Sequence, residues 1–199
     1  MSNRPSQNTI PLRTISDFKS RLTGGGARPN LFEVELAFPS DIVVSEKNDV
    51  LTKSRFLVKA AALPSSTVAP IEIPFRGRIL KIAGDRTFET WTITVLNDTD
   101  FVIRSAFEKW MNVINKLDDG TGLQAPDSYQ KDAMVHQLDR DGGILRSYKF
   151  WDIWPSNIST IDLNYETTDT LEEFTVEMQV HFWEAFKGTS ATAGGEDIR

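Results

Sequence analysis

The sequence predicts a mainly β protein, in which two packed antiparallel sheets form a small β-barrel or sandwich flanked by one α-helix over about 99–117. Three observations support this fold class. Most of the chain after residue 30 alternates apolar and polar residues with a period of two, which is typical of half-buried strands. One segment has apolar residues spaced by three and four, which is the period of an amphipathic helix. Clusters of Gly, Pro, Asn and Asp separate these segments and mark the turns.

The composition divides the chain into three parts. Residues 1–26 are rich in Pro and Gly, and we expect them to form a flexible arm in which Ser16 caps a short helix that carries Phe18. Residues 27–186 are long enough for one sizeable core and should form a single β domain. Residues 187–199 are small and polar and should form a flexible tail.

The alternating segments are expected to be the strands of the two sheets. They cover residues 32–38, 56–62, 71–82, 91–95, 133–138, 144–151, 161–165 and 174–182. Pro74 indicates a break or an edge position within the third segment, because proline cannot donate to a strand ladder. The Asp- and Gly-rich residues 139–143 predict a hairpin turn between the fifth and sixth segments.

The helical segment follows the fourth strand. Its apolar positions are Ile103, Phe107, Trp110, Ile114 and Leu117. Asp98 or Thr99 is expected to be the N-cap, since both side chains can accept a hydrogen bond from a free amide of the first turn. Residues 118–131 are rich in Gly and Pro and should form a loop.

The charge and residue content exclude several functions. There are 22 Lys and Arg against 28 Asp and Glu, a net charge of −6, and this argues against a surface that grips nucleic acid. The N-terminus has no apolar core of a signal peptide, and no apolar run approaches membrane-spanning length. We therefore expect a soluble chain that is made and assembled in a cytoplasm.

No catalytic, metal or cofactor site is expected. The chain has no cysteine, and its two histidines, His136 and His181, lie on different predicted strands, whereas a zinc site needs three or four ligands. The neighbouring carboxylates Asp139 and Asp141 fall in a turn, where Asp bonds its own backbone. Glu172 and Glu173 begin a strand beside solvent, and no partner for acid–base chemistry is recognisable.

Two groups of side chains are candidates for contacts outside the subunit. Trp151 and Trp183 are predicted to lie on the face opposite the apolar stripe of their strands, where large aromatics are enriched if subunits meet. Acidic residues also lie opposite the predicted buried stripes, on strand faces that otherwise carry Thr, Asn and Gln. These acidic candidates are Glu33, Glu35, Asp162, Glu173 and Glu177.

Four short stretches in register resemble the tail tube proteins of T4-like contractile-tailed phages. They are Ala27–Phe32, Ala62–Pro64, Ala83–Thr92 and Trp154–Asn157, and the resemblance extends from about Ala27 to Glu184. It implies a structural subunit rather than an enzyme, with a fold related to that of the type VI secretion tube protein. It also implies a component of the virion tail that is assembled in the host cytoplasm and has no membrane.

The resemblance implies the partners as well. Such subunits form six-membered rings that stack into a tube, a sheath surrounds the tube, a tape-measure protein sets its length, and a baseplate initiates it. Double-stranded DNA passes through the lumen without specific binding, so some of the acidic candidates are expected to line that lumen.

One segment departs from the T4-like pattern. Residues 40–54 are longer than in that pattern and contain Ile42, Val43 and Val44 within a charged frame. They are interpreted either as an extended hairpin that contacts a neighbouring ring or the sheath, or as a decoration. Three alternative functions also remain: a single-ring baseplate or terminator protein, a type VI tube subunit, and a β-barrel that binds a small ligand.

Overall fold

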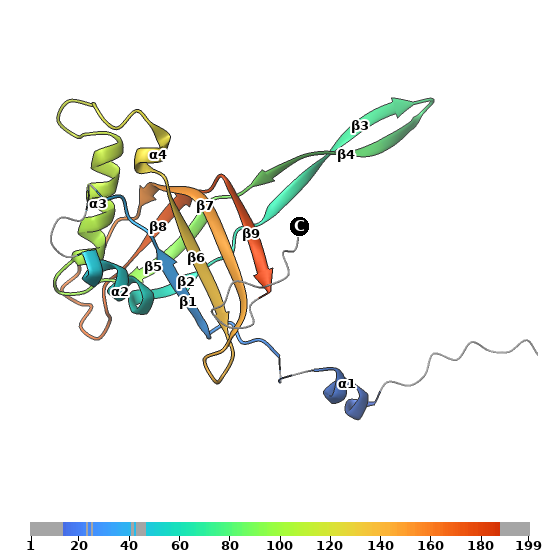
Figure 1. Ribbon diagram of the computed structural model, residues 1–199, viewed down its shortest axis with the longest axis horizontal. Coiled ribbons are helices and arrows are strands. Elements are labelled where there is room, and N and C mark those ends of the chain that lie inside the picture. Colours follow the sequence, from blue (N-terminus) through green and yellow to red (C-terminus); the bar gives the residue numbers. More distant parts are fainter. Residues whose placement is uncertain (1–13, 23, 25, 41, 43–46, 188–199) are drawn as a thin grey trace, which may run out of the picture.

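The computed structural model describes residues 14–22, 24, 26–40, 42 and 47–187 (Figure 1). The helices are α1 (Ile15–Arg21), α2 (Lys47–Leu57), α3 (Val102–Ile114) and α4 (Pro126–Tyr129). The strands are β1 (Phe32–Leu36), β2 (Val58–Ala61), β3 (Ser66–Phe75), β4 (Arg78–Phe88), β5 (Trp91–Leu96), β6 (Lys131–Leu138), β7 (Ile144–Ile158), β8 (Glu173–Gln179) and β9 (Phe182–Lys187).

Seven of these strands form two antiparallel sheets that share β7. Sheet I contains β1, β6, the first part of β7 and β9; sheet II contains the second part of β7, β8, β5 and β2. The transition lies at Asp152, where a φ of 54° separates the stretch that pairs with β9 from the stretch that pairs with β8. The terminal strands of this order, β1 and β2, are not paired with each other. The predicted pair of packed antiparallel sheets is confirmed, and it is a sandwich rather than a closed barrel.

The core lies between the two sheets and is closed on one side by α2 and α3 (Figure 1). The rings of Trp91 in sheet II and Phe150 in sheet I stack with centroids 4.4 Å apart, so they join the sheets directly. The inward residues of β5 and β8 are fully buried, as their alternation predicts. They are Trp91, Ile93, Val95, Phe174, Val176 and Met178.

The amphipathic helix is confirmed as α3, which buries Ile103, Phe107 and Trp110 against the sheets. It is shorter than predicted, because it ends at Ile114 and leaves Leu117 95% exposed. The predicted N-cap is wrong. Phe101 occupies this position in the left-handed conformation, without a side-chain cap.

The predicted cap residue Asp98 has a different role. Its carboxylate accepts a hydrogen bond from Nζ of Lys53 in α2, at 2.7 Å. This contact lowers the pKa of Asp98 below its ordinary value of 3.8. The segment that precedes α3 is therefore joined to α2 by an ion pair, and the helix has no side-chain cap.

The described residues of segment 40–54 form neither of the two structures expected from the sequence, a hairpin or a decoration. Residues 47–54 instead form the first part of α2, which packs against the core. Ile42 and Val50 are each only 3% exposed and belong to the main hydrophobic cluster, next to β1. The sequence pattern does not predict this burial, because charged residues surround the apolar ones. Ile42 reaches the core from a turn, and Val50 reaches it from one side of a helix.

The predicted strand over 161–165 is wrong. The chain between β7 and β8 forms a long loop, in which Leu163 is 86% exposed and Tyr165 is fully exposed. Alternation alone does not make a strand here, since no neighbouring strand is present to accept its backbone hydrogen bonds.

The predicted strand over 174–182 is interrupted. β8 ends at Gln179 and β9 begins at Phe182, so the alternation restarts between them. β8 pairs with β5 and β7 in sheet II, whereas β9 pairs with the first part of β7 in sheet I. The chain thus crosses from one sheet to the other at this point.

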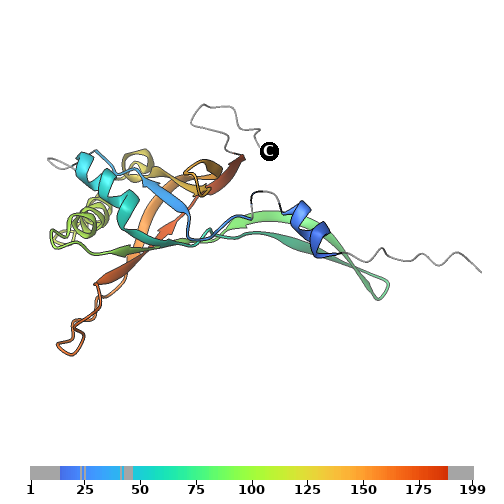
Figure 2. The same ribbon diagram turned by 90° about the horizontal axis from the view of Figure 1, so that it is seen from below.

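The predicted single strand over 71–82 is a hairpin. β3 and β4 form a separate two-stranded sheet that extends away from the sandwich (Figures 1 and 2). Its turn is Arg76-Gly77, with φ values of 47° and 81°, the pair of positive values that a tight type I′ hairpin turn requires. Pro74 lies near this turn in a strand with no second neighbour, which agrees with the predicted edge position.

The short N-terminal helix is confirmed as α1, but its cap differs from the prediction. Thr14, not Ser16, is the N-cap, and it forms a reciprocal capping box with Asp17. These hydrogen bonds lower the pKa of Asp17. α1 has no buried residue, and in Figure 1 it lies apart from the sandwich.

Candidate assembly surfaces

Nothing in the described part of the chain resembles a catalytic or metal centre. No group of three or more His, Asp or Glu side chains in that part could hold a metal ion. His136 contacts the hydroxyl of Ser147 at 2.7 Å, and His181 lies edge-on to Phe182 in a different part of the molecule. The features that stand out are four exposed surfaces, which we describe in turn.

The first surface is the outward face of sheet II, which is mainly polar. Along β8, Glu173, Thr175 and Glu177 alternate with buried apolar residues, and they lie opposite Leu96, Thr94 and Thr92 of β5. The described strands of this sheet contain a single cation, Lys59 of β2, and its Nζ lies 2.5 Å from Glu173. This surface, which we call the sheet II polar face, therefore presents hydroxyls and carboxylates without an unpaired positive charge.

The second surface is the outward face of sheet I, where charges of both signs neutralise one another. Glu33 and Glu35 of β1 lie 3.6 and 2.6 Å from the guanidinium of Arg55 in α2. Lys149 of β7 pairs with Asp132 of β6 at 3.1 Å. The predicted acidic group is thus divided: Glu173 and Glu177 share one face, Glu33 and Glu35 lie on the other sheet, and Asp162 lies in a loop.

The two tryptophans predicted to share an outward face lie on opposite faces of sheet I. Trp151 is outward, where it stacks on Phe182 and lies beneath Nζ of Lys149. Trp183 is paired with Phe150 on the inward face and packs against the core cluster. The predicted outward position of Trp183 is wrong, because the prediction assumed one uninterrupted strand, whereas the break before β9 reverses which residues face inward.

The apolar residues of the 40–54 segment also divide. Ile42 is buried in the core of its own subunit and is not exposed for a contact with another. Val43 and Val44 lie outside the described residues.

The third surface is the β3–β4 hairpin. Residues paired across the hairpin share a face, so Ile71, Ile73 and Phe75 of β3 lie with Ile82 and Leu80 of β4. All five are 42–66% exposed, because the hairpin has no second layer. An isolated two-stranded hairpin is marginally stable in water, and this apolar face is unusual for a free surface.

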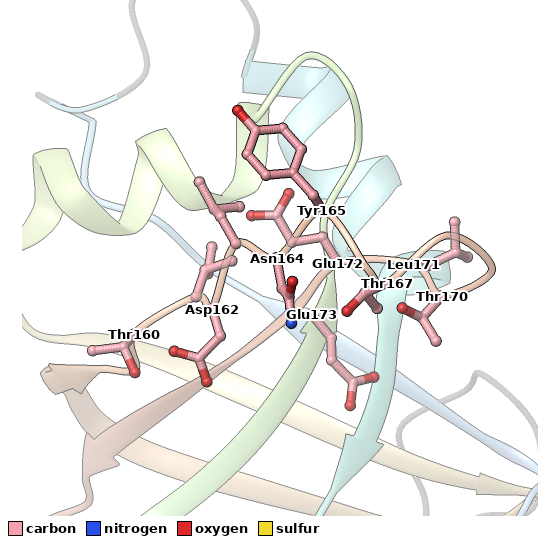
Figure 3. Close-up of a pocket in the computed structure, with 11 residues that line it drawn as sticks. Thr160, Asp162, Asn164, Tyr165, Thr167, Thr170, Leu171, Glu172 and Glu173 are labelled. Carbon is pink, nitrogen blue, oxygen red and sulfur yellow. The ribbon is translucent and has the colours of Figure 1, made fainter.

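The fourth surface is the loop between β7 and β8, which encloses an open cleft of about 660 Å³ (Figure 3). Figure 3 shows that the cleft is formed by both arms of the loop, with Asp162 on one arm and Leu171 on the other. The loop carries no Lys or Arg. Its carboxylates are Asp162, Glu166, Asp169 and Glu172, and Glu173 follows as the first residue of β8.

The hairpin and the cleft were not predicted, although the sequence contains a signal for each. The hairpin turn is marked by Arg76-Gly77 between two apolar runs. The cleft is marked by the complete absence of Lys and Arg between Lys149 and Lys187. No helix within the described ranges is long and apolar enough to cross a membrane.

Comparison with known proteins gives the chain a family. The family model of the phage tail tube protein matches residues 27–185. The chain is 31% identical over 163 residues to the tail tube protein gp19 of Enterobacteria phage T4, covering 81% of this chain and 93% of the relative. It is 25% identical over 171 residues to the tail tube protein of Serratia phage KSP90, covering 84% and 94% of the two chains.

Solved structures share the fold at low sequence identity. A chain in the sheath–tube complex of the extracellular contractile injection system PVC, in the extended state, has a TM-score of 0.56 at 10% identity, covering 89% of this chain and all of that one. A chain in the tube-terminating cap of the anti-feeding prophage has a TM-score of 0.61 at 12% identity, covering 92% and 98%. The matched residues 27–185 include the hairpin, the acidic loop and both sheets except the last two residues of β9. The chain therefore belongs to the phage tail tube protein family, whose members are structural proteins rather than enzymes.

Proposed function

We propose that this chain is the repeating subunit of a contractile phage tail tube, in which six-membered rings stack and the sheet II polar face lines the lumen. Family membership supports the structural role. The observation that carries the lumen assignment is the composition of the sheet II polar face, where hydroxyls and carboxylates surround one cation that is already paired.

The physical reason is the behaviour of DNA near a charged wall. Lys and Arg bind phosphates because they release condensed counterions, and this release is the main source of nonspecific affinity. A wall without unpaired cations gives no such gain, so double-stranded DNA can slide without being held. The outward face of sheet I fits this role less well, because it carries Arg55 and Lys149 among its carboxylates.

Ring closure requires that each subunit contact its neighbour through two different surfaces. The open edges of sheet II are β2 on one side and the second part of β7 on the other, and unpaired edges are templates for strand addition. Joined at these edges, sheets II of six copies would form one continuous inner barrel. Sheet I, α2 and α3 would then face outward, toward a sheath, and a tape-measure protein would occupy the lumen during assembly.

The test compares one charge reversal on each sheet. Glu177→Lys places a cation on the sheet II polar face, and Glu184→Lys makes the same change on the outward face of β9 in sheet I. We expect both variants to form rings and tubes by electron microscopy. We expect DNA release from virions to be impaired by Glu177→Lys and unchanged by Glu184→Lys.

Two results would contradict the proposal at different levels. Normal DNA release with Glu177→Lys would show that this face does not line the lumen. Failure of the unchanged protein to form tubes, even with a baseplate as initiator, would contradict the role as a repeating subunit. Single rings that never stack would instead favour the baseplate or terminator alternative.

A further inference from the structure

The tip of the β3–β4 hairpin is both basic and apolar. The turn Arg76-Gly77 is flanked by Phe75, which is 66% exposed, and by Arg78, which is paired with it across the hairpin. The Arg76 guanidinium lies 5.3 Å from the centre of the Phe75 ring. Within the described residues neither arginine has a carboxylate partner, since the nearby Glu72 pairs with Lys81 at 3.1 Å.

The cleft of the β7–β8 loop has the complementary character. It is lined by exposed apolar side chains, Leu163, Tyr165 and Leu171, together with the carboxylates Asp162 and Glu172. No acidic residue of the loop forms an ion pair with another described residue, whereas the adjacent Glu173 of β8 pairs with Lys59. The loop thus combines unpaired negative charge with apolar surface that nothing in the described part of the subunit covers (Figure 3).

The two features lie at opposite ends of the subunit. In Figure 1 the hairpin extends to the upper right, whereas the loop between β7 and β8 lies at the lower left. Figure 2, turned by 90°, also shows them at opposite ends. Because of this separation, the hairpin tip of a subunit cannot contact the acidic loop of the same subunit.

We propose that the hairpin tip of one copy of this chain docks into the acidic cleft of another copy. Phe75 enters the apolar part of the cleft, and Arg76 and Arg78 meet the carboxylates around it. Charge complementarity and two exposed apolar surfaces on the same chain identify the occupant as a second copy. A contact between two different surfaces at opposite ends is head-to-tail, and it builds an open stack when the repeated operation does not close into a ring.

This inference rests on the proposed function, because it names the contact that would propagate the tube. Charge reversal at the tip tests it. We expect Arg76→Glu combined with Arg78→Glu to lower the yield of tubes about tenfold or more, since like charges would then face each other. Adding Asp162→Lys and Glu172→Lys to the same chain should restore the yield. Arg140→Glu, in the exposed turn between β6 and β7, is the matched control and should have no effect.

Cross-linking gives an independent measurement. The natural chain has no cysteine, so introduced thiols are the only ones present. Pro74→Cys beside the tip and Thr167→Cys in the cleft leave the proposed contact residues intact. With a short bismaleimide, tubes of the double variant should give a ladder of covalent oligomers, whereas each single variant should remain monomeric.

The outcomes separate this inference from the proposed function. Unchanged tube yield with the reversed tip, or intact tubes of the double variant without a ladder, would overturn the contact and leave the tube role standing. Normal tubes that no longer bind a sheath would show that the tip serves a different protein, which also overturns the contact. If the unchanged protein forms no tubes with its initiator, the proposed function itself fails.

Discussion

Trp110 connects three segments at the helical side of the core. It is fully buried, stacks on Phe107, meets Phe38 edge-on, and donates from Nε1 to the carbonyl oxygen of Tyr129 at 2.8 Å. One side chain therefore joins α3, the segment after β1, and the short helix α4. Such a residue combines packing with a buried hydrogen bond.

Substitutions of Trp110 should separate the contribution of its ring packing to stability from the contribution of its hydrogen bond. We expect Trp110→Ala to lower the free energy of unfolding by about 3–5 kcal/mol, because it leaves a cavity. Trp110→Phe should cost about 1–3 kcal/mol, since it keeps most of the packing but leaves the Tyr129 carbonyl unpaired. Urea denaturation measures these values, with Leu117→Ala, at a 95% exposed position of the same segment, as the control that should change little. Equal losses for both Trp110 variants would show that the hydrogen bond, and not the packing of the ring, accounts for the stabilisation.

The ion pair of Asp98 and Lys53 predicts a dependence on pH. The hydrogen bond from Lys53 lowers the pKa of Asp98 in the folded state below 3.8, so its contribution to stability is complete above that value. The contribution is lost as the pH falls through the lowered folded pKa. Asp98→Asn should therefore destabilise the protein at pH 7, and the difference from the natural chain should shrink as the pH falls below 3.8.

The measurement is the free energy of unfolding at a series of pH values. Asp141→Asn, in the exposed turn between β6 and β7, is a matched control that should show no such trend. A difference for Asp98→Asn that stayed constant from neutral to acid pH would contradict the assigned role of the ion pair.

At the scale of elements, the β3–β4 hairpin depends on its own backbone geometry. Its register shifts between Val68 and Pro70, and Gly84 lies opposite this irregularity. A Cβ on Gly84 would lie 2.6 Å from the carbonyl oxygen of Ala69, a distance that no real side chain tolerates. The glycine is therefore required by a close approach of two backbones.

Gly84→Ala should disturb the hairpin and spare the sandwich. We expect hydrogen exchange of the β3 and β4 amides to become about tenfold faster or more, because the clash must be relieved by opening the local ladder. Amides of β5 and β8 should be unaffected. Gly143→Ala, with no atom within 4 Å of the added methyl group, is the control. Uniform acceleration across the whole chain would show that the hairpin and the sandwich unfold together.

At the scale of the whole molecule, α1 takes no part in the packing of the sandwich. α1 buries no residue, and the family match begins at residue 27. A chain that starts at Ala27 should therefore fold with a Tm within about 2 °C of that of the full chain. Calorimetry or circular dichroism measures this. A fall of about 10 °C would show that the segment before residue 27 stabilises the sandwich.

The whole molecule also has an uneven charge distribution that its net charge of −6 does not reveal. The hairpin tip is basic, the β7–β8 loop is acidic, and sheet I is neutralised by ion pairs on its own surface. Such an arrangement favours contacts between opposite ends of identical chains. The described strands of sheet II, by contrast, present no unpaired cation on the sheet II polar face.

The sequence by itself determined the fold class, the amphipathic helix and the buried stripes of β5 and β8. These features follow from periodicity, because a residue's face within one regular element depends only on its spacing. The four short stretches also identified the family correctly. Even so, the local rules misplaced the helix cap at Asp98, since a distant Lys53 competes for that carboxylate.

Only the tertiary structure decided which residues share a surface. Glu33 and Glu177 both alternate with buried apolar residues in their strands. They nevertheless lie on different sheets, and Glu33 is paired with Arg55. The break after β8 placed Trp183 inward, and the lack of a partner strand left residues 161–165 as a loop. The physical reason is that alternation defines two faces of a strand, whereas pairing between distant strands decides which face is covered.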